Sequence, residues 1–93
     1  MPKQLRHRSR SEIMSSILQV TNGNRARVTE IQYETYLSYN ILKEYLVHLL
    51  ENDLVEYVEG ERTFKTTPKG MQFLQVYSRM DELFVPNSIP NGE

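Results

Sequence analysis

The chain has 93 residues, of which 39% are hydrophobic and 25% are charged, so it is long enough for one small domain. It contains no cysteine, which excludes disulfide bonds, thiol catalysis and cysteine-ligated zinc and agrees with a cytoplasmic location. No apolar run approaches the length of about 18 residues that a membrane span needs. Four scattered glycines and two distant histidines offer no phosphate loop, catalytic triad or metal cluster. We therefore expect neither an enzyme nor a cofactor.

The net charge of −1 conceals two regions of opposite sign. Residues 1–27 contain six basic residues against one acid, a balance of +5, whereas residues 28–93 contain five against eleven, a balance of −6. This separation predicts a basic arm or face attached to a mildly acidic body. We expect residues 1–8 to be a disordered basic arm. Four cations of the arm and of the first residues after it are candidates to follow a phosphate backbone: Lys3, Arg6, Arg8 and Arg10. The alternative is that the arm is only a solvated tail.

Three helices are predicted in the first half of the chain. Ser9 and Glu12 have the spacing of a capping box, which predicts a helix from about residue 10 to residue 20. A second, short helix is expected after Val28, with Thr29 as its cap. Ser38 then caps the clearest helix, and His48 within it is expected to be a partly buried structural histidine. The apolar stripe of this third helix, which we expect to be buried, consists of Ile41, Leu42, Tyr45, Leu46, Leu49 and Leu50.

A hairpin and a last helix complete the predicted domain. Residues 54–59 alternate apolar and acidic side chains, and residues 62–66 form the return strand after a turn. Thr67 and Pro68 open a helix over about residues 68–84, which Pro86 ends. We therefore expect a mainly α fold with a small β-hairpin, in the order helix-helix-helix-hairpin-helix. This domain would cover residues 9–85, and residues 86–93 would be a flexible tail.

The second and third helices have the spacing of a helix-turn-helix, and the hairpin that follows them would be a wing. The series Val28-Thr29-Glu30-Ile31, Leu37-Ser38-Tyr39 and Thr67-Pro68-Lys69-Gly70 resembles the archaeal winged helix-turn-helix regulators. That group includes small chromatin proteins that dimerise through their last helix. The resemblance covers about residues 11–84. It implies binding to double-stranded DNA, with the Ser38 helix in the major groove and the wing along the backbone.

The outward side of the third helix supplies the first candidates for DNA contact. Asn40 is suited to pairing with adenine, and Lys43 to contacting guanine or phosphate. Glu34 and Glu44 would repel phosphate, so a solvated helix face is the alternative. Further candidates lie at the start of the second helix and in the hairpin. Arg62 and Lys65 are three residues apart, so in a regular strand they point to opposite faces and only one of them can face the DNA. The full set is Arg25, Arg27, Ser38, Tyr39, Asn40, Lys43, Arg62 and Lys65. Tyr36 would contact the DNA backbone or pack on the first helix.

The last helix is apolar around more of its circumference than one small core can cover. Four large side chains recur at intervals of four, three and four residues, which predicts one seam of a homodimer. These residues are Phe73, Tyr77, Met80 and Phe84. Alternatively, the first helix and the arm cover the apolar surface of the last helix that the core leaves open.

The sequence also allows a second class of function. The domain could serve as a protein–protein interaction module in a transcription or other macromolecular complex, without direct DNA binding. The acidic excess after residue 27 and the near-neutral total charge favour this module, whereas Arg25, Arg27 and the basic arm favour DNA. The surface charge around the Ser38 helix distinguishes the two.

Overall fold

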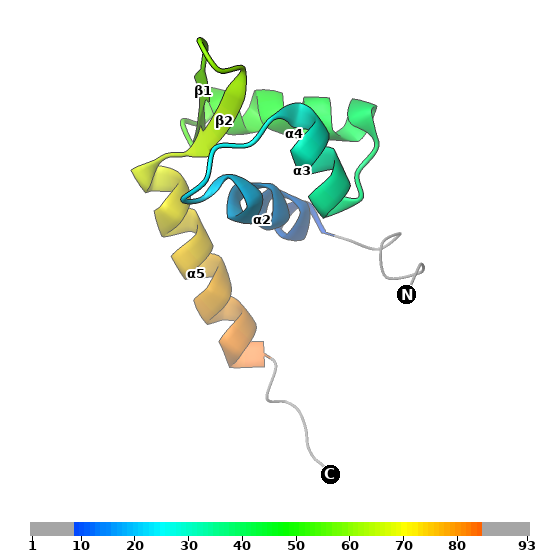
Figure 1. The fold of residues 1–93 in the computed structure, drawn as a ribbon. Coiled ribbons are helices and arrows are strands. Elements are labelled where there is room, and N and C mark those ends of the chain that lie inside the picture. The colour runs from blue at the N-terminus through cyan, green and yellow to red at the C-terminus, as the bar shows by residue number, and fades with distance from the viewer. Residues whose placement is uncertain (1–8, 85–93) are drawn as a thin grey trace.

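The computed structural model describes the backbone of residues 9–84 and the side chains of residues 9–80. Its elements follow in the predicted order of three helices, a hairpin and a closing helix, and Figure 1 shows how they are arranged. They are α2 (Arg10–Thr21), α3 (Val28–Thr35), α4 (Tyr39–Glu51), β1 (Val55–Val58), β2 (Thr63–Thr66) and α5 (Pro68–Phe84). The expected basic arm with Lys3, Arg6 and Arg8, and the expected tail, lie outside the described residues.

Side-chain caps begin three of the four helices where the sequence predicts them. Ser9 Oγ accepts a hydrogen bond from the Glu12 amide at 3.1 Å, and the Glu12 carboxylate accepts one from the Ser9 amide at 3.2 Å. Ser38 Oγ accepts from the Ile41 amide at 3.3 Å, and Thr67 Oγ1 accepts from the Gly70 amide at 3.0 Å. Each cap satisfies an amide at the start of a helix that has no partner within the helix.

The predicted cap of α3 is wrong. The N-cap is Arg27 and not Thr29, so the helix begins at Val28. The Glu30 carboxylate accepts a hydrogen bond from the Arg27 amide at 2.8 Å. Glu30 is the third residue of the helix, and its bond to the Arg27 amide stabilises a helix start at Val28, before the predicted cap at Thr29.

The core lies between α2, α3, α4 and the hairpin. Leu42, Leu46 and Leu49 of α4 are buried in it, as predicted, and Tyr45 is half-buried. The predicted burial of Ile41 and Leu50 is wrong, since each is 40% exposed. Both residues lie at the outer edges of the apolar stripe of α4, and the core covers only the middle of that stripe. The buried apolar residues are Ile17, Leu18, Ala26, Ile31, Leu42, Leu46, Leu49, Leu54, Val55 and Phe64.

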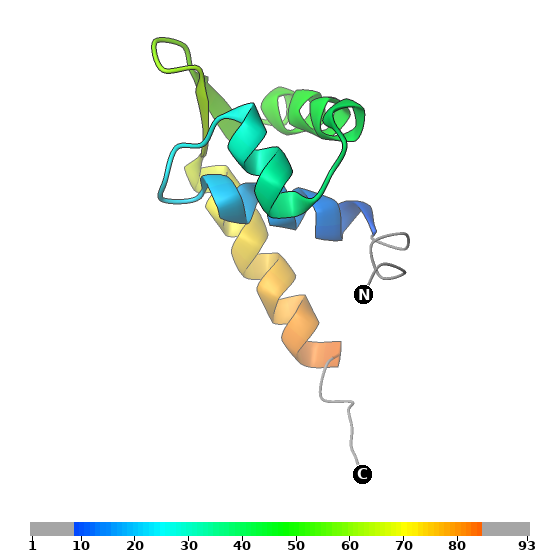
Figure 2. The same ribbon diagram turned by 45° about the vertical axis from the view of Figure 1, so that its right-hand side comes forward.

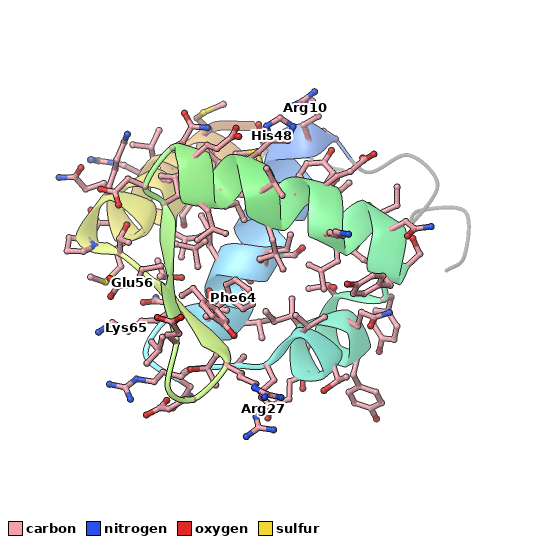
Figure 3. The ribbon with its side chains drawn as sticks, turned by 90° about the horizontal axis from the view of Figure 1, so that it is seen from above. Arg10, Arg27, His48, Glu56, Phe64 and Lys65 are labelled. Atoms are coloured by element: carbon pink, nitrogen blue, oxygen red, sulfur yellow. The ribbon has the colours of Figure 1, made fainter. Side chains whose placement is uncertain are left out.

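His48 is exposed, so its predicted partial burial is also wrong. In Figure 3 it lies on the side of α4 away from Phe64, the core residue that the hairpin contributes. Apolar neighbours in the sequence do not bury a helical residue, because successive side chains point about 100° apart around the axis.

The hairpin is a two-stranded antiparallel sheet in which Glu56 pairs with Lys65 and Tyr57 pairs with Phe64. The rings of Tyr57 and Phe64 share one face, with their centroids 5.0 Å apart. Ala26 and Phe64 exchange two backbone hydrogen bonds of 3.1 and 2.8 Å, which tie the hairpin to the segment before α3. Arg62 lies in the turn, with a φ of 59°, and not in the strand as predicted.

The last helix starts beneath the hairpin and packs against α2 and β2. The backbone of Gly70 lies against the Leu54 carbonyl, so closely that a Cβ there would be 2.2 Å from its oxygen. Phe73 and Leu74 pack on the core. Farther along, α5 extends away from the other elements in both Figure 1 and Figure 2, and its second half therefore lies outside the body of the domain.

Candidate nucleic-acid interface

The start of α4 presents an exposed polar surface. We call the exposed residues Ser38, Tyr39, Asn40 and Lys43 the α4 face. The Ser38 cap fixes the start of the helix, and Lys43 Nζ lies 6.0 Å from the centre of the Tyr39 ring. The Asn40 side chain has no hydrogen-bond partner among the described residues. The α4 face therefore combines one cation with one uncommitted amide at the end of the helix where a recognition helix meets base edges.

Two cations from other elements border the same side of the molecule. Arg27, at the start of α3, and Arg62, in the hairpin turn, line one hollow together with Leu50 of α4. The side chains of both arginines are exposed and have no ion-pair or hydrogen-bond partner among the described residues. The fold thus brings Arg27 and Arg62 into one hollow with the C-terminal part of α4, and Tyr39 and Lys43 of the α4 face line the hollow beside it.

The other two predicted cations are held by carboxylates. Arg25 Nη1 lies 2.5 Å from Glu61 Oε2, and Lys65 Nζ lies 3.5 Å from Glu56 Oε2. In Figure 3, Lys65 and Glu56 lie on the side of the hairpin away from α3. Both pairs are about half exposed, so they contribute little to stability, although each offsets one positive charge. Arg25 was expected to contact phosphate, and its ion pair with Glu61 was not predicted.

Sequence reasoning missed the hollow itself. It has a volume of about 590 Å³, and its floor is apolar. A second hollow of about 200 Å³ adjoins it toward the α4 face and shares Val28, Leu50 and Phe64 with it. No pattern in the sequence indicates it, because the exposure of Leu50 and of Tyr57 on the hairpin depends on the fold. The larger hollow is lined by Arg27, Val28, Thr29, Leu50, Tyr57, Arg62 and Phe64.

Exposed tyrosines surround the turn between α3 and α4. Tyr36 is 77% exposed, so of its two predicted alternatives the one in which it packs on the first helix is wrong. It ends α3 in the left-handed region, with a φ of 62°, and its side chain points outward. Tyr33 and Tyr39 are exposed on either side of it. These hydroxyls add hydrogen-bonding groups, without charge, beside the α4 face.

The remaining predicted site residues divide between α2 and α5. Arg10 is exposed in the first turn of α2. In α5, Phe73 and Tyr77 are half-buried and Met80 is 49% exposed, whereas the side chain of Phe84 is outside the described set. Phe73 packs on the core of its own domain. The predicted seam is therefore partly occupied within one chain.

Two further features are absent from the described part of the chain. None of its helices is both long enough and apolar enough to cross a membrane. Residues 9–80 also bring together no group of three histidine, cysteine, aspartate or glutamate side chains that could hold a metal ion.

Three helices, an antiparallel hairpin directly after the third, and a closing helix define a winged helix-turn-helix domain. The family model for winged helix-turn-helix proteins matches residues 7–84, and the chain belongs to this family. No curated protein matches the chain in a sequence comparison.

Proposed function

We propose that this domain binds double-stranded DNA, as a transcriptional regulator or chromatin-associated protein of the archaeal type, with α4 in the major groove. One observation carries the proposal. Tyr39 and Lys43 of the α4 face line a hollow that adjoins the one lined by Arg27 and Arg62, two arginines with no partner among the described residues. A recognition helix needs this combination, because cations on both sides hold the backbone while the start of the helix meets the bases.

Each residue then has a distinct task. Asn40 reads a base edge, since its amide can donate to and accept from adenine at once. Lys43, Arg27 and Arg62 neutralise phosphates, and the exposed Tyr39 hydroxyl adds a neutral contact to the backbone. Arg25 and Lys65 can bind phosphates only after their ion pairs with Glu61 and Glu56 break. Their contribution to DNA affinity is therefore smaller than that of an unpaired cation.

The experiment is a titration of fluorescent duplex DNA at several salt concentrations. Neutralising about three phosphates gives a slope of log K against log salt of about −3, and arm contacts steepen it to about −4 to −5. Arg27→Ala should weaken binding to all sequences alike, whereas Asn40→Ala should lose about tenfold or more at one preferred base pair and little on random duplex. Arg79→Ala, on the exposed side of α5, is the control. Absence of binding at low salt, or binding that salt does not weaken, would overturn the proposal.

We further propose that two copies associate through the half of α5 that extends from the domain body. Val76 is 58% exposed and Met80 is 49% exposed, and one helical turn separates them on the same side. Because Phe73 packs on its own core, the proposed interface shifts from the predicted seam toward Val76, Tyr77 and Met80. A two-fold interface would cover this apolar surface and double the number of phosphate contacts.

A protein-interaction module is the second candidate function. Ile41 and Val47 are exposed on α4, at 40% and 46%, and apolar side chains of this kind serve a protein partner better than a phosphate backbone. The duplex titration separates the two candidates. If the chain binds no duplex at low salt while its fold is intact, the interaction module replaces the DNA-binding proposal.

A further inference from the structure

The hollow between α3, α4 and the hairpin has an apolar floor that DNA binding does not require. Phe64 lies at its base, between these elements in Figure 3, and is 8% exposed. Leu50 and Tyr57 stand in its walls with 40% and 45% of their surface exposed. Large apolar side chains left open in a concave site lower the free energy when a ligand covers them.

The edge of the hollow is positively charged. Arg27 and Arg62 both line it, and neither guanidinium has an ion-pair or hydrogen-bond partner among the described residues. Arg25 and Lys65, in contrast, are paired with carboxylates. Of these four cations, the two without a partner among the described residues are thus the two that border the apolar floor. Guanidinium groups bind carboxylates through directed, charge-assisted hydrogen bonds.

DNA alone does not account for this combination. The backbone presents phosphates and sugars, and the major groove offers a single apolar group, the thymine methyl. Phosphates would engage the guanidiniums of Arg27 and Arg62 and leave the floor below them uncovered. A molecule that carries an apolar body and a carboxylate on one end matches both parts of the hollow at once.

We propose that the hollow binds a small amphiphilic carboxylate, with its carboxylate between Arg27 and Arg62 and its aromatic or branched aliphatic body against Leu50, Tyr57 and Phe64. The hollow is shallow and open to solvent, with a volume of about 590 Å³, so a ligand would lie across its floor and not be enclosed. One consequence rests on the proposed DNA binding. A bound carboxylate occupies the two arginines that would otherwise hold phosphates, so ligand and DNA compete.

The site is tested without DNA. The isotope-labelled chain is titrated with 1-naphthoate and, separately, with 1-naphthalenemethanol, which has the same aromatic body and no charge. Naphthoate should shift the amide signals of Val28, Leu50 and Phe64 and should bind about tenfold more tightly than the alcohol, because charge-assisted bonds to guanidinium are lost in the alcohol. Arg27→Gln with Arg62→Gln should reduce naphthoate affinity at least tenfold and leave the alcohol unaffected. Arg79→Gln, which removes an exposed arginine on α5, is the control.

The proposal is overturned if the acid and the alcohol bind equally, if the double variant binds naphthoate as tightly as the original chain, or if the shifts fall outside the hollow. Because both substituted arginines are exposed, the amide spectrum should stay that of the folded domain. Competition is measured next, as the loss of duplex affinity when naphthoate is added. Unchanged duplex affinity with the hollow filled would refute competition. A chain that binds no duplex at all would refute the proposed function, while the DNA-free titration would still decide the site.

Discussion

Arg25 Nη1 lies 2.5 Å from Glu61 Oε2, so the segment before α3 is joined to the turn of the hairpin. The two residues are 36 positions apart in the chain. In the winged helix-turn-helix arrangement both segments flank the side of the molecule that we propose for DNA. Glu61 therefore removes one cation from the phosphate contacts and adds a repulsive charge at the hairpin turn.

Glu61→Gln should increase duplex affinity several-fold and steepen the salt dependence by about one unit of slope, because Arg25 becomes available to a phosphate. The fluorescence titration measures both quantities. Glu59→Gln is a matched control, since Glu59 is an exposed acid in the same hairpin with no side-chain partner among the described residues. It removes the same charge without releasing Arg25, so its slope should stay that of the original chain. Equal slopes for both variants would contradict the role assigned to Arg25.

Gly70→Ala should destabilise the domain by about 1–3 kcal/mol, as overpacking of a close contact does. The added Cβ would be 2.2 Å from the Leu54 carbonyl oxygen and 2.6 Å from Thr66 Cγ2. Gly60→Ala is the matched control, because no atom lies within 4 Å of a Cβ at that position. Urea unfolding followed by circular dichroism gives both free energies. Similar unfolding midpoints for the two variants would show that α5 does not pack on Leu54 as closely as described.

The hydroxyls of Thr21 and Thr66 lie 2.8 Å apart in the core, and Thr66 Oγ1 also donates to the Leu18 carbonyl at 2.8 Å. Thr21→Val and Thr66→Val should each cost about 1 kcal/mol, because each removes a buried hydrogen-bonding group and keeps the side-chain shape. The double variant should cost less than the sum of the two, by about 0.5 kcal/mol or more. Strict additivity in chemical unfolding would mean that the two hydroxyls do not interact.

Val76→Glu with Met80→Glu should convert the proposed dimer into a folded monomer that binds duplex more weakly. Both side chains are about half exposed in the single chain, so the domain itself should remain stable. Gln75→Glu with Ser78→Glu adds the same two charges on other sides of α5 and should leave the dimer intact. Sedimentation at micromolar concentration measures the mass of each form. A monomeric mass for the unmodified protein would exclude the interface.

The order of elements and most helix starts followed from the sequence, because short-range contacts determine them. Ser9, Ser38 and Thr67 each act on an amide three residues away, a spacing that is visible in the chain. Burial was predicted less well. Leu50 and His48 were expected to be at least partly buried and are exposed, because the extent of burial depends on which neighbours the fold supplies.

The candidate site was predicted in part. Positions on the α4 face could be assigned because helical periodicity separates outward from inward residues. The ion pairs of Arg25 and Lys65 could not, since they depend on hairpin register and on a loop far away in the sequence. The hollow is lined by Arg27, Leu50 and Arg62 from three separate segments. Their proximity depends on the tertiary fold, so no spacing in the sequence predicts it.

The proposed DNA interface is tested most directly by mapping amide chemical shifts while duplex DNA is added at low salt. The largest changes are expected at Ser38, Tyr39, Asn40 and Lys43, with further changes at Arg27 and Arg62 and none in the first turns of α5. Shifts confined to other surfaces, or a spectrum that duplex leaves unchanged, would contradict it.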